Sequence, residues 1–160
     1  MVTEGDSAPD FTAPTRTPDG NITELTLSSV LGDGPVVLAF FPGAFTSVCT
    51  GEMRTFRDRL DRLADAGASL YGISIDTPFS LGEFAEQNEL TFPLVSDSNK
   101  EIIEAYDIAM DFDELGVTGV AKRSVFVVDG DGTVTYAWVS DDPGVEPDYE
   151  EVERAAADAA

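Results

Sequence analysis

Six consecutive apolar residues, Val36 to Phe41, run into a helical pattern after a short gap, and this junction most constrains the fold. An unbroken apolar run of this length is typical of a strand buried on both faces. From Met53 to Leu63 apolar side chains recur at spacings of three and four, which predicts an amphipathic helix over roughly residues 47–66. The sequence therefore predicts a core strand that leads into a helix packed against the same sheet.

The rest of the chain continues this alternation of strand and helix patterns. The first thirty residues predict an extended segment and a hairpin that turns at Pro18-Asp19-Gly20. Further strands are predicted at residues 22–27, 69–75, 92–97, 124–128 and 133–139, and further helices at 78–88, 100–106 and 147–159. Residues 111–114 are interpreted as an acidic loop without chemistry of its own. With no repeat and no linker visible, we expect one domain over residues 1–160, an α/β protein with a mixed central sheet flanked by helices.

The chain has one cysteine, Cys49, and no histidine. Cys49 lies near the start of the predicted helix, where the unpaired N–H groups of the first turn and the helix dipole stabilise a thiolate over a thiol. A single cysteine excludes an intrachain disulfide, a CxxC redox pair and a cysteine-rich metal site. The absence of histidine excludes Ser-His-Asp triads, Cys-His dyads and histidine zinc sites. We therefore expect a nucleophilic cysteine that is activated without a histidine base, and no metal.

Acidic residues outnumber basic ones by 31 to nine, which gives a formal net charge of −22. They are dispersed through a normal core pattern, whereas a disordered acidic tail would concentrate them. We interpret this surface as an adaptation to molar salt, typical of a halophile, where screening over about 3 Å removes the self-repulsion; a merely acidic protein is the alternative. Such a surface makes nucleic acids and anionic membranes poor partners. No apolar run of 18 residues and no secretory signal is visible, so we expect a cytoplasmic protein.

The segment around Cys49 has the spacing Pro42-x-x-x-Thr46-x-x-Cys49. It resembles the PxxxTxxC signature of the peroxiredoxin (AhpC/TSA) family, and the likeness extends from Gly5 to the region of Trp138. The residues of this segment are most similar to those of the one-cysteine, AhpE-like subgroup. A strand followed by a cysteine at the start of the next helix also resembles the thioredoxin fold. The resemblance thus implies a thioredoxin-like protein that reduces hydroperoxides.

The resemblance assigns roles to three residues of this motif. Cys49 is expected to be the peroxidatic nucleophile, which attacks the terminal peroxide oxygen and becomes a sulfenic acid. The Thr46 hydroxyl is expected to point at the peroxide and the Cys49 sulfur, accepting a hydrogen bond from one and donating to the other. Pro42 is expected to shield the thiolate from water. Taken alone, the three residues also fit an inert buried thiol, a helix N-cap and a strand end.

Cleavage of a peroxide bond builds negative charge on the departing oxygen, which requires fixed donors and a cation. The backbone N–H groups around Val48 and Cys49 are candidate donors. The resemblance places the cation at Arg123, directly before the strand 124–128. Glu52 is expected at the substrate-binding site, where it would orient that cation. Taken alone, Arg123 also fits a solvated charge at a strand end, and Glu52 an acid in the first turn of a helix.

The sequence therefore predicts a one-cysteine thiol peroxidase that reduces hydrogen peroxide and organic hydroperoxides without a cofactor. Since no resolving cysteine exists, we expect the reductant to be an external thiol or a thioredoxin- or glutaredoxin-like protein. Family analogy implies a homodimer or a higher homo-oligomer. The alternatives are a thiol–disulfide oxidoreductase, which the missing CxxC opposes, and a non-enzymatic redox sensor or holdase that uses the same cysteine. Steady-state peroxide turnover distinguishes the last alternative from an enzyme.

Overall fold

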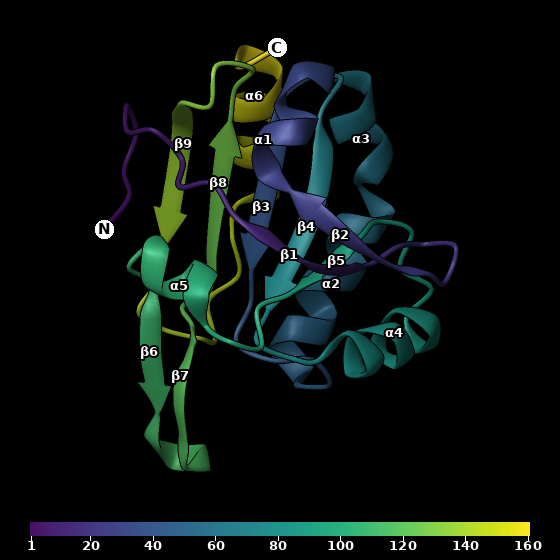
Figure 1. The fold of residues 1–160 in the computed structure, drawn as a ribbon, viewed down its shortest axis with the longest axis vertical. Coiled ribbons are helices and arrows are strands. Elements are labelled where there is room, and N and C mark those ends of the chain that lie inside the picture. Colours follow the sequence, from purple (N-terminus) through teal and green to yellow (C-terminus); the bar gives the residue numbers. More distant parts are fainter.

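The structure is a computed structural model that describes residues 1–160. Its centre is a seven-stranded sheet (Figure 1). The strands lie in the order β2-β1-β5-β4-β3-β8-β9. Their bounds are β1 Thr12–Arg16, β2 Ile22–Thr26, β3 Val36–Phe40, β4 Ser69–Ser74, β5 Leu94–Ser96, β8 Ser124–Val128 and β9 Val134–Val139. β3 pairs in parallel with β4 and antiparallel with β8, so the sheet is mixed, as predicted.

The helices are α1 Leu27–Val30, α2 Ser47–Asp58, α3 Leu60–Asp65, α4 Pro78–Gln87, α5 Glu101–Ala105 and α6 Tyr149–Asp158, with 3₁₀ turns at Leu31–Asp33 and Asp113–Leu115. α6 begins two residues later than predicted, because the Asp148 side chain caps it by accepting from the Glu151 N–H at 3.2 Å. None of these helices is both long and apolar enough to span a lipid bilayer.

The prediction of one continuous helix over residues 47–66 was wrong. The helical path is interrupted at Arg59, whose φ of −109° and ψ of 8° separate α2 from α3. Its guanidinium forms a bidentate ion pair with Glu153 of α6, at 2.7 Å from Nε and 2.9 Å from Nη2. The apolar spacing continues across the interruption, so periodicity alone does not reveal it.

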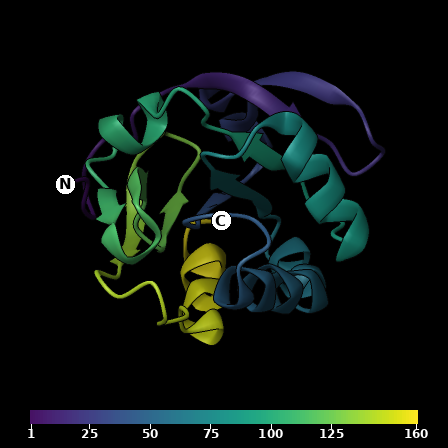
Figure 2. The same cartoon turned by 90° about the horizontal axis from the view of Figure 1, so that it is seen from below.

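The side chains of β3 alternate between two separate cores, as a strand buried on both faces requires. Val37 and Ala39 belong to a cluster that includes side chains of α2, α3, α4 and α6. Leu38 and Phe40 belong to a second cluster, with side chains of α5 and of the first two strands. Viewed from below, α2 and α6 lie on one side of the sheet and α5 on the other (Figure 2). The thioredoxin-like arrangement of a mixed sheet between helices is thus confirmed.

A two-stranded hairpin, β6 Ala109–Phe112 and β7 Val117–Ala121, forms a second sheet. It projects below the main sheet in Figure 1, and we refer to residues 109–121 as the arm. The prediction of an acidic loop at residues 111–114 was wrong, since this stretch contains the end of β6 and the 3₁₀ turn. The arm is largely exposed and thus lacks the apolar run by which a core strand is predicted.

Candidate active site

Several strand ends meet at one end of the sheet, and the strand register determines which loops lie there. Phe40, at the end of β3, pairs with Ser124, at the start of the antiparallel β8. Phe40 also pairs with Ile73 near the end of β4, and Ser124 pairs with Val139 at the end of β9. The residues that follow β3, β4 and β9 therefore lie close to the residue that precedes β8.

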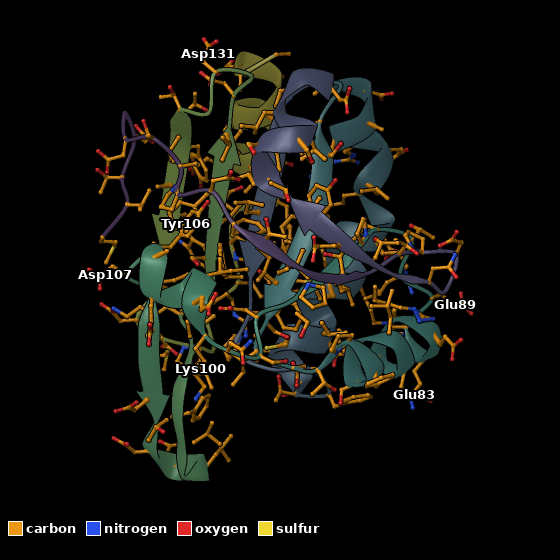
Figure 3. All side chains as sticks on the ribbon, in the orientation of Figure 1. Glu83, Glu89, Lys100, Tyr106, Asp107 and Asp131 are labelled. Carbon is orange, nitrogen blue, oxygen red and sulfur yellow. The ribbon has the colours of Figure 1, made fainter.

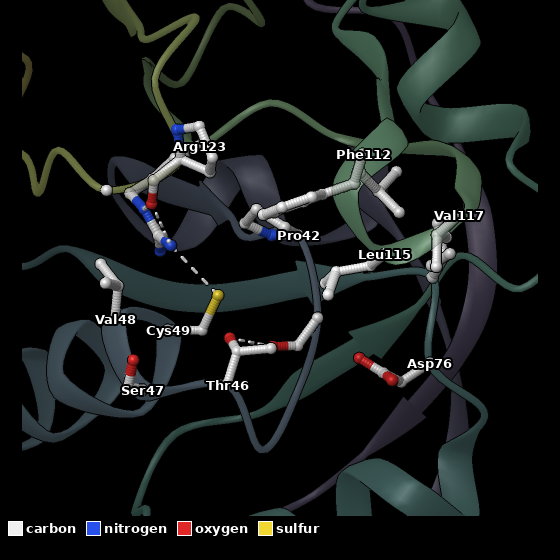
Figure 4. Close-up of a pocket in the computed structure, with 15 residues that line it drawn as sticks. Pro42, Thr46, Ser47, Val48, Cys49, Asp76, Phe112, Leu115, Val117 and Arg123 are labelled. Atoms are coloured by element: carbon white, nitrogen blue, oxygen red, sulfur yellow. Dashed lines mark hydrogen bonds between the residues drawn. The ribbon is translucent and has the colours of Figure 1, made fainter.

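A cavity of about 400 Å³ lies at this end of the sheet (Figure 4). Its 15 lining residues are Pro42, Gly43, Thr46, Ser47, Val48, Cys49, Ile75, Asp76, Phe112, Leu115, Val117, Val120, Arg123, Pro143 and Gly144. They come from the start of α2, the loops after β3, β4 and β9, the arm, and the residue before β8. The cavity is thus built from segments far apart in the sequence.

Cys49 lies in the first turn of α2 at the inner end of this cavity, and only 1% of its surface is exposed. Thr46 is the N-cap residue, but its side chain makes no capping hydrogen bond. Instead its hydroxyl donates to the Gly43 carbonyl at 2.9 Å. The first-turn N–H groups, which have no acceptor within a helix, are therefore not capped by a side chain. They belong to the same helical turn as Cys49.

Arg123 is the cation of this site, and it is as deeply buried as the cysteine. Its Nη2 lies 3.1 Å from Cys49 Sγ and donates to the Pro143 carbonyl at 2.9 Å. Its Nη1 donates to Glu52 Oε1 at 2.6 Å, and its Nε donates to the Pro143 carbonyl at 3.1 Å. Burial alone lowers the pKa of Arg123, but the charges of Glu52 and Cys49 outweigh burial and raise that pKa above its ordinary value. The guanidinium therefore stays charged beside the sulfur.

Glu52 lies one helical turn after Cys49, with no exposed surface. One carboxyl oxygen accepts from Arg123, and the other, Oε2, has no hydrogen-bond partner. Burial raises the pKa of Glu52 to about 8, although the attraction of Arg123 acts in the opposite direction and Glu146 adds a small further increase. One guanidinium is thus shared between a thiol and a carboxyl group on the same helix.

Comparison with known proteins identifies the family. The sequence profile described as the AhpC/TSA family matches residues 4–137. The chain belongs to the AhpC/TSA family. It is 36% identical over 139 residues to alkyl hydroperoxide reductase E of Mycobacterium tuberculosis, which covers 86% of this chain and 85% of the relative. The solved structure of peroxidoxin BcpB from the same organism is 32% identical, with a TM-score of 0.83. The match covers 98% of this chain and 97% of BcpB. The structure of a reduced 2-Cys peroxiredoxin of Plasmodium vivax is 25% identical, with a TM-score of 0.84. The match covers 96% of this chain and 80% of the Plasmodium chain.

The predicted class is confirmed: the chain is a peroxiredoxin, a thiol peroxidase, and its single cysteine is consistent with a one-cysteine mechanism. Most of the residues predicted for the site line one cavity, namely Pro42, Thr46, Val48, Cys49 and Arg123. Glu52 does not line it; it lies behind Arg123 and contacts the guanidinium. The Thr46 hydroxyl donates its hydrogen to the Gly43 carbonyl and not to the Cys49 sulfur. Its oxygen can therefore only accept a hydrogen bond from a peroxide.

Several parts of the peroxiredoxin site were missed from the sequence. They are the Pro143 carbonyl, which accepts from Arg123, the carboxylate of Asp76, which accepts from the Ala44 N–H at 2.8 Å, and the side chains of the arm. Phe112, Leu115 and Val117 of the arm line the cavity opposite Cys49 (Figure 4). The available signal was two large apolar residues, Phe112 and Leu115, spaced among acids before Gly116, and a third, Val117, directly after it.

Proposed function

We propose that Cys49 reduces hydroperoxides as a thiolate whose charge is balanced by Arg123. The observation that carries this proposal is the distance of 3.1 Å from Arg123 Nη2 to Cys49 Sγ in a cavity open to a small molecule. A buried guanidinium stabilises an adjacent thiolate much more strongly than an exposed one, since the surroundings screen the charge less. The first turn of α2 adds uncapped N–H groups on the same side.

In the proposed step, the thiolate of Cys49 attacks the terminal oxygen of the hydroperoxide. An S–O bond forms and the O–O bond breaks, so the sulfur is oxidised to a sulfenic acid and the peroxide is reduced to an alcohol or water. The departing oxygen carries the electron pair of the broken bond and takes up a proton from solvent. The N–H groups of Val48 and Cys49 stabilise its growing charge.

The other residues of the motif position the peroxide and exclude water. Thr46 accepts a hydrogen bond from the peroxide O–H, since its own hydrogen is donated to Gly43. Pro42 is buried beside the cavity and carries no N–H that would need water. Glu52 orients Arg123 from behind as a positioning residue.

The test is intact-protein mass spectrometry after one equivalent of hydrogen peroxide. We expect a gain of one oxygen, or its dimedone adduct, on wild-type protein and none on Cys49→Ser. Multiple turnovers with a supplied thiol should accompany this modification. Modification without turnover would instead support the sensor or holdase alternative. Peroxide consumption with an unmodified Cys49 would contradict the mechanism.

We further propose a homodimer that uses the cavity end of the molecule. Exposed apolar side chains gather there: Phe45, Phe79, Leu115 and Val117 each line the cavity or lie within three residues of a lining residue. Among solved peroxiredoxin relatives, Prx1a of Plasmodium yoelii modified at its N-terminus forms an artifactual octamer. Light scattering after size exclusion should give about twice the mass of the chain, and a monomer at all salt concentrations would contradict the dimer.

We also propose a cytoplasmic, salt-adapted protein that folds as one domain; the charge of −22 supports the salt adaptation. Mutual repulsion of the acids opposes compaction in dilute buffer and is screened in molar salt. We expect a single thermal unfolding transition whose midpoint temperature rises steeply between 0.1 M and 2 M KCl. Circular dichroism measures this transition. A midpoint that does not change over this range would contradict the salt adaptation.

A further inference from the structure

One wall of the cavity is formed by the arm, and burial holds the arm only at its base. Val120 and Ala121 are its buried residues. Phe112 and Val117, farther out on the hairpin, also line the cavity. Two antiparallel strands without a covering layer are only marginally stable by themselves. The position of this wall therefore requires a contact other than burial.

A β-bulge interrupts the arm among these lining residues. The register shifts between Met110 and Phe112. Asp111, between them on β6, faces both Thr118 and Gly119 on β7. Gly119 has a φ of +68°, a left-handed conformation that favours glycine, and its N–H donates to Asp111 Oδ1 at 3.1 Å. Since a bulge re-aims the side chains next to it, this one determines how the lining residues on both of its sides are directed.

Lys100 contacts the bulge from outside the hairpin, and Figure 3 shows it beside the arm. Its Nζ donates to the Thr118 carbonyl at 2.7 Å. The approach is close, because a Cβ atom added at Gly119 would lie 3.1 Å from Nζ and 3.2 Å from Cδ of the lysine. The lysine side chain thus occupies the space that a side chain at position 119 would need.

The backbone of Lys100 is in turn fixed to the main sheet. Its N–H donates to the Asp97 carbonyl at 2.9 Å, and the Asp97 N–H donates to the carbonyl of Ser74, at the end of β4, at 2.7 Å. The buried Asp97 carboxylate accepts from the N–H groups of Ile102 and Ile103 in α5, at 3.0 and 2.9 Å. The lysine therefore connects the bulge of the arm to a rigid part of the core.

From these contacts we propose that Lys100 is a positioning residue that holds the arm at the cavity and thereby sets the relative rates with bulky and small hydroperoxides. This inference rests on the proposed peroxidase function. Lys100 does not line the cavity, so it acts through the arm and not on the peroxide. A hydroperoxide with a bulky apolar group is stabilised by contact with the apolar side chains of the arm. Hydrogen peroxide is too small to reach the arm while it reacts with the sulfur.

The test compares Lys100→Met with Arg154→Met in 2 M KCl. Methionine keeps an unbranched apolar side chain and removes the hydrogen-bond donor. Arg154 is exposed on α6, at the opposite end of the molecule from the arm (Figure 1), so this control loses the same charge without touching the arm. The measured quantity is the second-order rate with cumene hydroperoxide divided by the rate with hydrogen peroxide.

We expect this ratio to fall about fivefold in Lys100→Met, because the apolar wall is no longer held in position, and to keep its wild-type value in Arg154→Met. The rate with hydrogen peroxide should not change in either variant. Lys100→Arg retains a charged donor and should give a ratio closer to wild type than Lys100→Met does. A wild-type ratio in Lys100→Met, an equal fall in the control, or equal slowing with both peroxides would overturn the proposal.

Hydrogen exchange followed by mass spectrometry tests the contact without any peroxide. Protected amides of residues 109–121 should exchange at least about threefold faster in Lys100→Met than in wild type or Arg154→Met, with no change in β3 and β8. Unchanged exchange in the arm would overturn the proposal. If wild-type protein forms no sulfenic acid with peroxide, the proposed function fails, whereas the exchange measurement still decides whether Lys100 holds the arm.

Discussion

The two walls of the cavity are built in opposite ways. The wall to which we assign the chemistry, Cys49 and Arg123 with Glu52 behind them, is almost fully buried and linked by charged hydrogen bonds. The opposite wall, formed by the arm, consists of apolar side chains on a two-stranded hairpin, and Leu115 is 62% exposed. Apart from Val120 and Ala121 at its base, no residue of this hairpin is buried, so little burial holds its tip in place.

This difference suggests a division of roles between the walls. The buried wall is held by the register of β3 against β8, so its geometry is fixed by the core of the protein. The arm lines the same cavity and has no hydrogen bond to the sulfur. We therefore expect changes in the buried wall to alter stability and the chemical step for every peroxide. Changes in the arm should alter the preference among peroxides.

The largest expected effect concerns Glu52 and the pH dependence of stability. The folded protein holds a proton on this carboxyl up to about pH 8, whereas the unfolded chain loses it near the ordinary value of 4.5. Between these values unfolding releases a proton, so this group lowers stability as pH rises, by about 1 kcal/mol per pH unit. Glu52→Gln removes this dependence, which changes the free energy of unfolding by on the order of 3 kcal/mol between pH 5 and 8.

Urea unfolding of wild type and Glu52→Gln at several pH values in 2 M KCl measures this difference. Other titrating groups contribute to both proteins, so only the difference between the two slopes is interpreted. Parallel pH dependences would show that the buried wall does not hold the proton on Glu52.

Arg123→Lys tests the geometry of the same wall at constant charge. An ammonium group has no planar fork, so it cannot hold Glu52, Cys49 and the Pro143 carbonyl in the observed arrangement. We expect a native fold and a loss of about tenfold or more in the second-order rate with peroxide, or ~1.4 kcal/mol. The rate should fall equally for hydrogen peroxide and cumene hydroperoxide. A wild-type rate would place Arg123 outside the reaction.

Leu115→Ser tests the arm and should have the smallest effect. Loss of apolar contact with a bulky substrate should lower the rate of reaction with cumene hydroperoxide about threefold, or ~0.7 kcal/mol. The rate with hydrogen peroxide should not change. Ile22→Ser is the matched control, because Ile22 is also an exposed apolar residue but lies on β2 and not at the cavity. If both peroxides slow equally in Leu115→Ser, the two walls do not differ in role.

The sequence allowed the buried wall to be predicted and not the arm, for physical reasons. The strand of Val36 to Phe40 and the helix around Cys49 follow from local apolar patterns, and the wider family resemblance supplied Arg123. The break falls at Arg59, whose ion-pair partner Glu153 is 94 residues away, and the apolar spacing that continues across it leaves no local signal. The arm and the Pro143 carbonyl were missed because their roles arise only when distant loops meet at one end of the sheet.

The separation of Cys49 from its cation along the chain has a consequence for biosynthesis. Arg123 follows Cys49 by 74 residues. At about 5–20 residues per second, the ribosome adds the arginine several seconds after the cysteine. During this interval the nascent chain carries the cysteine without its counter-ion and without the finished cavity. If Arg123 activates Cys49 as proposed, the thiol gains that activation only when β8 has been made and has paired with β3.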